Sequence, residues 1–114
     1  MSGGTRTEDY LRDMLEHAVK AQEFVRGMTF ERFVDDDKTS YATMRALEII
    51  GEAARKIPLD FRNAHSGIRW RAICGMRDRL IHDYKGIMHS VVWNTVHDDL
   101  PALKVQLREL LGEN

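Results

Sequence analysis

The sequence has little of three things that would restrict its fold: cysteine, proline and long apolar runs. Its single cysteine, Cys74, excludes an intrachain disulfide and fits a reducing cytosol. No apolar run approaches the roughly 18 residues of a membrane span, and no charged-then-apolar leader opens the chain. We therefore expect a cytoplasmic protein that makes no contact with a membrane.

Breaks in regular structure are also scarce, since only two prolines and eight glycines occur in 114 residues. Long helices are therefore available, and no stretch alternates apolar and polar residues far enough to build a sheet. The net charge of −1 argues against a basic nucleic-acid coat protein, although a local basic patch suffices for a transient contact. We expect one domain, residues 1–114, with residues 1–5 as a flexible N-terminal tip.

Apolar residues recur at three- and four-residue steps in the segments that we expect to be helical. These are residues 6–26, 38–56, 69–84, 90–100 and 101–111. Thr5 and Gly27 are the expected ends of the first helix, Ser90 is the expected cap of the fourth, and Pro101 marks a kink or a restart. Residues 58–68 are expected to be irregular, and 29–37 to form a solvated loop before a helix N-terminus. The pattern predicts an all-α bundle of four to five helices.

Side chains that can bind anions or transfer protons are concentrated in one stretch, Met76–Tyr84. On a helical wheel Arg77 lies in the middle of the apolar stripe. Burying an arginine without a partner is costly, so either an internal acid neutralises it or it lines a cleft that binds an anion. Glu48 and Glu52 could neutralise Arg77 internally, and we expect them to form a solvated or intraprotein ion pair and not to act in catalysis.

His82 lies on the opposite side of the same helix, about 140° from Arg77. Asp78, four residues earlier, can hydrogen-bond to the imidazole and orient it, and Gly75 leaves room for another helix or a ligand. Arg79 is the nearer basic neighbour of His82 on the wheel. The plain alternative is that these cations only complement the dipole at a helix C-terminus.

The stretch from Arg77 to Tyr84 resembles the Arg-x4-His-x-Tyr motif of the HEPN superfamily, specifically of its HepT-like toxins. The resemblance extends over nearly the whole chain, including residues 47–53, 92–93 and 99–101. It implies a HEPN-type up-and-down bundle that forms a homodimer or higher oligomer, with the motif helices of two protomers meeting at one cleft. It also implies an endoribonuclease that needs no metal or other cofactor.

The resemblance assigns a role to each motif residue. His82 would act as general acid–base on the ribose 2′-hydroxyl of an RNA, Arg77 would hold the scissile phosphate, and Asp78 and Arg79 would support them. Cleavage would leave a 2′,3′-cyclic phosphate. Tyr84 would receive AMP from a minimal nucleotidyltransferase antitoxin (MntA-like), as in a type VII toxin–antitoxin system; alternatively it is an amphipathic aromatic that closes the helix.

Two further functions stay open at this stage. The chain is alternatively a non-catalytic helical subunit that binds a nucleotide or substrate for a nucleotidyltransferase, or a purely structural bundle. The other histidines show no metal-ligand spacing, and Cys74 is expected in the core. The arginine on the apolar stripe together with an oriented histidine favours the enzyme.

Overall fold

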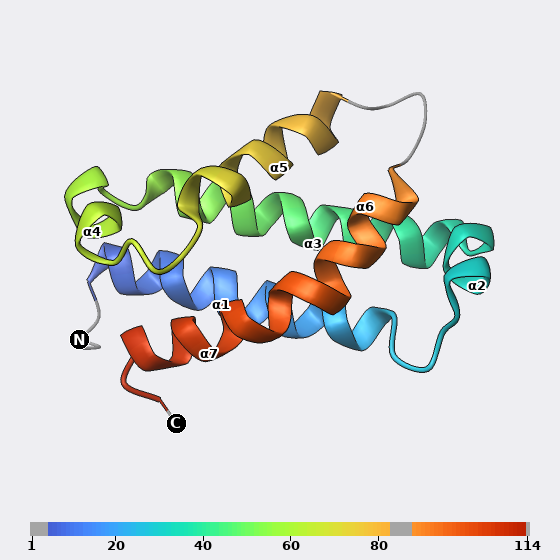
Figure 1. The fold of residues 1–114 in the computed structure, drawn as a ribbon, viewed down its shortest axis with the longest axis horizontal. Helices are drawn as coiled ribbons and strands as arrows, with labels where there is room; N and C mark the ends of the chain where they lie inside the picture. Colours follow the sequence, from blue (N-terminus) through green and yellow to red (C-terminus); the bar gives the residue numbers. More distant parts are fainter. Residues whose placement is uncertain (1–4, 83–87, 114) are drawn as a thin grey trace.

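The computed structural model describes residues 5–82 and 88–113, and within these ranges the chain is helical with no strand. The elements are α1 (Arg6–Phe24), α2 (Phe30–Asp35), α3 (Asp37–Lys56), α4 (Leu59–Ala64), α5 (Trp70–His82), α6 (His89–Asn94), the π-helical turn η1 (Thr95–Asp99) and α7 (Leu100–Leu110). The predicted all-α bundle is confirmed (Figure 1).

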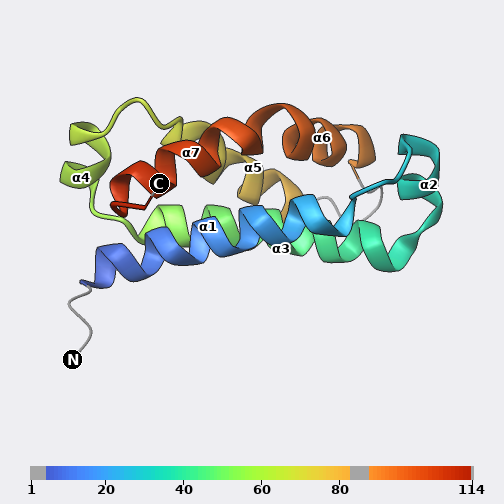
Figure 2. The same cartoon turned by 90° about the horizontal axis from the view of Figure 1, so that it is seen from below.

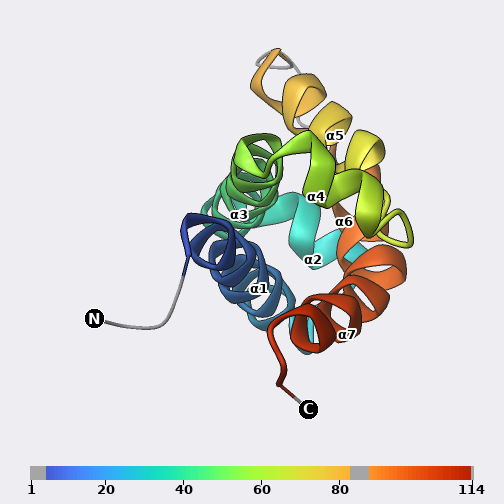
Figure 3. The ribbon, with the colours of Figure 1, turned by 90° about the vertical axis from the view of Figure 1, so that its left-hand side faces the viewer.

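The two longest helices, α1 and α3, run antiparallel and pack along most of their lengths (Figure 2). Both helices bury small side chains, Ala18 and Ala21 on α1 and Ala46 and Ala54 on α3. Helix α7 lies on α1, whereas α5 packs on α3 (Figure 3). The bundle therefore has a central α1–α3 pair with one helix on each member.

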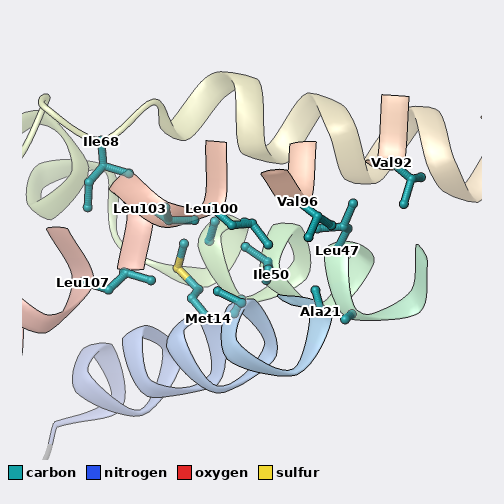
Figure 4. Close-up of a cluster of buried hydrophobic side chains, with 14 of the residues drawn as sticks. Met14, Ala21, Leu47, Ile50, Ile68, Val92, Val96, Leu100, Leu103 and Leu107 are labelled. Carbon is teal, nitrogen blue, oxygen red and sulfur yellow. The ribbon is translucent and has the colours of Figure 1, made fainter. Parts of the chain in front are cut away.

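One continuous core holds these layers together. Figure 4 shows Met14 of α1 and Ile50 of α3 facing the apolar side of the C-terminal helices. The side chains from that region are almost fully buried: Val92, Val96, Leu100, Leu103 and Leu107. Burial of this kind contributes about 1.5–3 kcal/mol for each large aliphatic side chain.

The ends of the long helices follow the predicted capping chemistry. Thr5 accepts a hydrogen bond from the backbone N–H of Glu8, and Gly27 has φ of 76° in the turn that ends α1. Asp36 caps α3 through the N–H of Thr39, and that bond lowers the pKa of the Asp36 carboxyl. The acidic segment thus meets a helix N-terminus as predicted.

Two short helices lie where irregular chain was predicted, so that part of the prediction was wrong. Helix α2 begins after Thr29, which caps the N–H of Arg32, and it buries Phe33 completely. Helix α4 follows Pro58, whose fixed φ suits the start of a helix. Helices of six residues are too short to show a 3.6-residue period, so they form because of burial and capping, which the sequence pattern does not reveal.

The C-terminal half continues from α6 through η1 into α7. The prediction of Ser90 as the cap was wrong, because α6 begins at His89 with Met88 in the cap position. Pro101 lies in the first turn of α7, directly after the π-helical turn. A proline ring clashes with the carbonyl four residues earlier, and widening the preceding turn relieves that clash. The predicted irregularity at Pro101 is confirmed.

No described helix combines the length and the apolar character needed to cross a membrane. Of the predicted flexible tip, residues 1–4 lie outside the described residues, as do residues 83–87, and Tyr84 is among them.

Candidate active site

The site begins with the contact between α3 and α5. Gly51 lies under Arg77: a Cβ at position 51 would fall on the Cβ of Arg77 and stand 3.0 Å from the carbonyl oxygen of Ile73. Glycine is therefore required for α5 to lie this close to α3. The sequence signal was a glycine in a helix interior, where it is disfavoured by about 1 kcal/mol relative to alanine, and no role was assigned to it.

Arg77 faces α3, which agrees with its predicted place on the apolar stripe of α5, and its side chain is 24% exposed. Its Nη1 donates to Oδ1 of Asp78 at 3.1 Å, while its Nε is buried without an acceptor in the described part of the chain. Asp78, the next residue in the chain, is thus the acid that pairs with Arg77. Glu48 and Glu52 form the expected intraprotein ion pairs, but their partner is Arg45, at 3.1 and 2.7 Å, and not Arg77.

Asp78 joins the two helices through a second arginine. Its Oδ1 also accepts from Nη2 of Arg55, near the end of α3, at 2.5 Å. The hydrogen bonds from Arg77 and Arg55 hold the pKa of the Asp78 carboxyl below its ordinary value of 3.8. The carboxylate therefore stays ionised and fixes the guanidinium of Arg77.

His82 is exposed on the outer face of α5, and its Nδ1 lies 2.7 Å from the backbone carbonyl oxygen of Asp78. The Asp78 carboxylate was expected to orient this ring, but the contact is made by the Asp78 backbone carbonyl, while Oδ1 of the carboxylate accepts from two arginines. A carbonyl only accepts, so the hydrogen bond requires the proton on Nδ1 and leaves the Nε2 lone pair free. His17 and His97 make the same local contact, so it is not specific to this site.

The chain brings Arg77 and Asp78 together but does not bring His82 to them. No hydrogen bond between Arg77 and His82 occurs in the described structure, and the two side chains lie on different faces of α5. Arg79 is exposed and forms no ion pair with any described residue. Nothing within 4 Å would meet a Cβ at Gly75, so the outer face of α5 is open.

Other candidate residues have structural surroundings. Cys74 is half-buried and packs against the core, and the indole of buried Trp70 donates to the carbonyl of His65 at 2.9 Å. In residues 5–82 and 88–113 no three His, Cys, Asp or Glu side chains gather as metal ligands do.

A pocket of about 300 Å³ lies on the other side of α5, between α3 and the C-terminal helices. Leu47 and Ile50 form its floor. Ile73 and Met76 line it from α5 and Leu103 from α7, while its polar lining includes Arg69, Asp98 and Asp99. The volume is near the lower end for small-molecule sites, and an apolar floor with few polar groups is typical of them.

Comparison with known proteins gives a consistent result. The family described as "Ribonuclease HepT-like" matches residues 14–110. A "probable ribonuclease HepT" of Thermococcus cleftensis is 48% identical over 90% of this chain and 94% of its own length. A "putative RNase" of Caldanaerobacter subterraneus is 43% identical over 88% and 93%, and one of Methanocaldococcus jannaschii is 36% identical over 92% and 90%. No solved structure matches the chain significantly.

Proposed function

We propose that this chain, which belongs to the HepT-like ribonuclease family, is a metal-independent endoribonuclease and the toxin of a type VII toxin–antitoxin pair. One observation carries the proposal: Arg77 is fixed over Gly51 by an ionised carboxylate, and five residues later His82 presents a free Nε2. An arginine held in place and an unblocked imidazole are the two groups that transesterification of RNA requires.

In the proposed mechanism Nε2 of His82 takes the proton of a ribose 2′-hydroxyl. The resulting oxygen attacks the adjacent phosphorus, and the bond from phosphorus to the 5′-oxygen breaks. The imidazolium of His82 then gives a proton to the leaving oxygen, and the products are a 2′,3′-cyclic phosphate and a 5′-hydroxyl. The planar fork of Arg77 donates to the phosphate oxygens as negative charge builds on them.

We further propose that the active form is a homodimer. His82 and Arg77 lie on different faces of α5, and the outer face of that helix is open at Gly75. If two copies of α5 face each other, His82 of one protomer can act on a phosphate held by Arg77 of the other. An isologous contact of this kind places two equivalent sites at one interface.

Tyr84 is the proposed target of the antitoxin, a minimal nucleotidyltransferase that transfers AMP to its hydroxyl. The residue follows His82 by two positions, so an added nucleotide would stand next to the catalytic residues. Its phosphate would compete with RNA for Arg77. Mass spectrometry after co-expression with the antitoxin should show whole AMP units on the wild type and none on Tyr84→Phe; an unmodified wild type would contradict this step.

Cleavage in the presence of EDTA tests the catalytic proposal. Wild type should cut RNA to products with 2′,3′-cyclic phosphate ends, and His82→Ala and Arg77→Ala should each lower the rate by about 10²–10⁴. Arg79→Ala distinguishes the two arginines of the motif, because Arg79 is exposed and forms no ion pair with a described residue, whereas Arg77 is paired with Asp78. Activity that survives Arg77→Ala but not Arg79→Ala would reassign the phosphate contact to Arg79.

The pocket beside α5 favours a second candidate, a non-catalytic module that binds a nucleotide for a nucleotidyltransferase. Its apolar floor suits a nucleobase, and Asp98 and Asp99 can accept hydrogen bonds from one. AMP titrated into the protein should then bind, and Ala102→Phe, which adds a ring to the lining, should abolish binding. AMP binding combined with no RNA cleavage would support this module over the ribonuclease.

A further inference from the structure

Positive charge is concentrated in one part of this nearly neutral chain. Residues 55–82 carry seven arginines and lysines against two aspartates, a net charge of +5. The rest of the chain therefore carries −6, since the whole has −1. The basic part runs from the end of α3 through α4 to the end of α5, which form one side of the bundle (Figure 1). Such an asymmetry produces a local positive field that the net charge conceals.

Three of these arginines line one shallow hollow of about 490 Å³ at the start of α5. Arg62 comes from α4, Arg69 from the connection before α5, and Arg71 from α5 itself. Asn63 and Ser66 add neutral polar groups, and no carboxylate belongs to the lining. The arginines therefore come from three separate segments that the fold brings together.

The three arginine side chains have no partner within the described part of the chain that would account for their coming together. None forms a hydrogen bond or ion pair with another described residue, and the Nε of Arg62 is buried without an acceptor. By contrast, Arg45, Arg55 and Arg77 are all paired with carboxylates. Arg69 also lines the pocket that holds Asp98 and Asp99, but no carboxylate lines the hollow itself. Like charges that converge in the hollow repel one another, and a bound anion would relieve that repulsion.

The position of the hollow points to a long polyanion rather than a single phosphate. From Trp70 to His82 a helix rises by about 18 Å, so the hollow and the catalytic histidine lie at opposite ends of α5. A dinucleotide at His82 does not reach that far, whereas an RNA strand can contact both ends.

Building on the proposed ribonuclease function, we propose that the hollow of Arg62, Arg69 and Arg71 binds phosphates of the RNA strand remote from the cut. The subsite makes the enzyme act on RNA chains long enough to span α5 and contributes little to cleavage of a dinucleotide. Guanidinium groups suit it, because their fork binds phosphate oxygens in pairs.

The binding test uses the full chain with His82→Ala, so that labelled 20-nucleotide RNA stays intact. Replacing Arg62, Arg69 and Arg71 with alanine should weaken binding about tenfold and lower the slope of log K against log salt by about 2, since each phosphate that an arginine neutralises adds ~0.7 to that slope. The matched control replaces Arg6, Arg26 and Arg32, which are exposed and lie outside the basic part. Equal weakening by both triple variants would overturn the proposal, because net charge alone would then explain binding.

A double variant, Arg69→Ala with Arg71→Ala, guards against misfolding, since both residues are exposed whereas Arg62 is half-buried. It should keep the thermal midpoint of the wild type and still weaken RNA binding severalfold. Unchanged RNA binding by this folded variant would overturn the subsite. Unchanged RNA binding with lost association to the nucleotidyltransferase would assign the hollow to that protein instead.

Cleavage kinetics separate this subsite from the catalytic proposal. With His82 intact, the triple variant should show a raised KM on the 20-nucleotide RNA and an unchanged kcat/KM on a dinucleotide. Loss of dinucleotide cleavage would show that the arginines act in catalysis and not as a remote subsite. If wild type cleaves neither substrate, the proposed function fails, while the binding test still decides whether the hollow takes RNA.

Discussion

Gly51 and Arg77 form the contact on which the position of the proposed catalytic arginine depends. The backbone of α3 at Gly51 leaves the space that the Arg77 side chain fills, and Asp78 then holds the guanidinium. The residue that positions the arginine therefore lies on a different helix and carries no functional group.

Substituting the two glycines of this region should have opposite effects. Gly51→Ala inserts a Cβ on top of the Arg77 Cβ, so we expect about 1–3 kcal/mol of destabilisation, as for overpacked cores, together with a reduced cleavage rate. Gly75→Ala meets nothing within 4 Å, and alanine favours the helix, so the free energy of unfolding should rise by up to about 1 kcal/mol. Urea unfolding measures both. Equal effects at the two positions would show that the α3–α5 contact is not tight.

We expect the ion pairs of Asp78 to make a pH-dependent contribution to the free energy of unfolding. Its pKa is lowered in the folded protein, first by the hydrogen bond from Arg77 and then by that from Arg55. A lowered folded pKa means that the stabilisation is present above the unfolded value near 3.8 and is lost as the pH falls through the folded value. Wild type should therefore be more stable than Asp78→Asn at pH 7, and the difference should vanish once the pH has fallen below the lowered folded pKa. A difference that persists in acid would assign the effect to packing.

At the scale of elements, α5 is the least enclosed of the long helices. Its contacts are with α3, and only Trp70 and Leu80 on it are buried. Helix α3 by contrast packs on both α1 and α5. A helix with one supporting surface opens more readily than one held on two sides.

Leu80 and Ile81 give a matched test of how α5 is held. Leu80 is 3% exposed, so Leu80→Ala should destabilise the fold by about 2–5 kcal/mol. Ile81 is 38% exposed, and Ile81→Ala should change stability by about 0.5 kcal/mol or less. Thermal or urea unfolding of the two variants measures both losses of stability. A large loss at Ile81 would mean that this face of α5 is covered, as in a dimer.

The elements also show what could be predicted from sequence. The three long helices have enough turns to show a 3.6-residue period, and that period correctly predicted that Arg77 lies on the apolar, inward side of α5. The short helices α2 and α4 have too few turns and depend on burial of Phe33 and on Pro58. The partners of Arg77, Asp78 and Glu48 depend on rotamers and on the approach of α3 to α5, which no single-helix wheel contains.

At the scale of the whole molecule, a single chain does not bring the two proposed catalytic residues, Arg77 and His82, together at one site. Arg77 is turned toward α3 and His82 toward the outside, so the proposed mechanism needs a second copy of the chain to complete the proposed catalytic pair. The exposed outer face of α5 is available for that contact, and the pair would then be divided between protomers.

Mixing two inactive variants tests this division most directly. Arg77→Ala and His82→Ala are each purified, mixed in equal amounts, exchanged through mild denaturant and assayed for cyclic-phosphate product in EDTA. If Arg77 and His82 come from different protomers, half of the dimers carry one intact site in two, so the mixture should regain about a quarter of the wild-type rate. A mixture that forms heterodimers and yet stays as inactive as either variant would contradict a site divided between two copies.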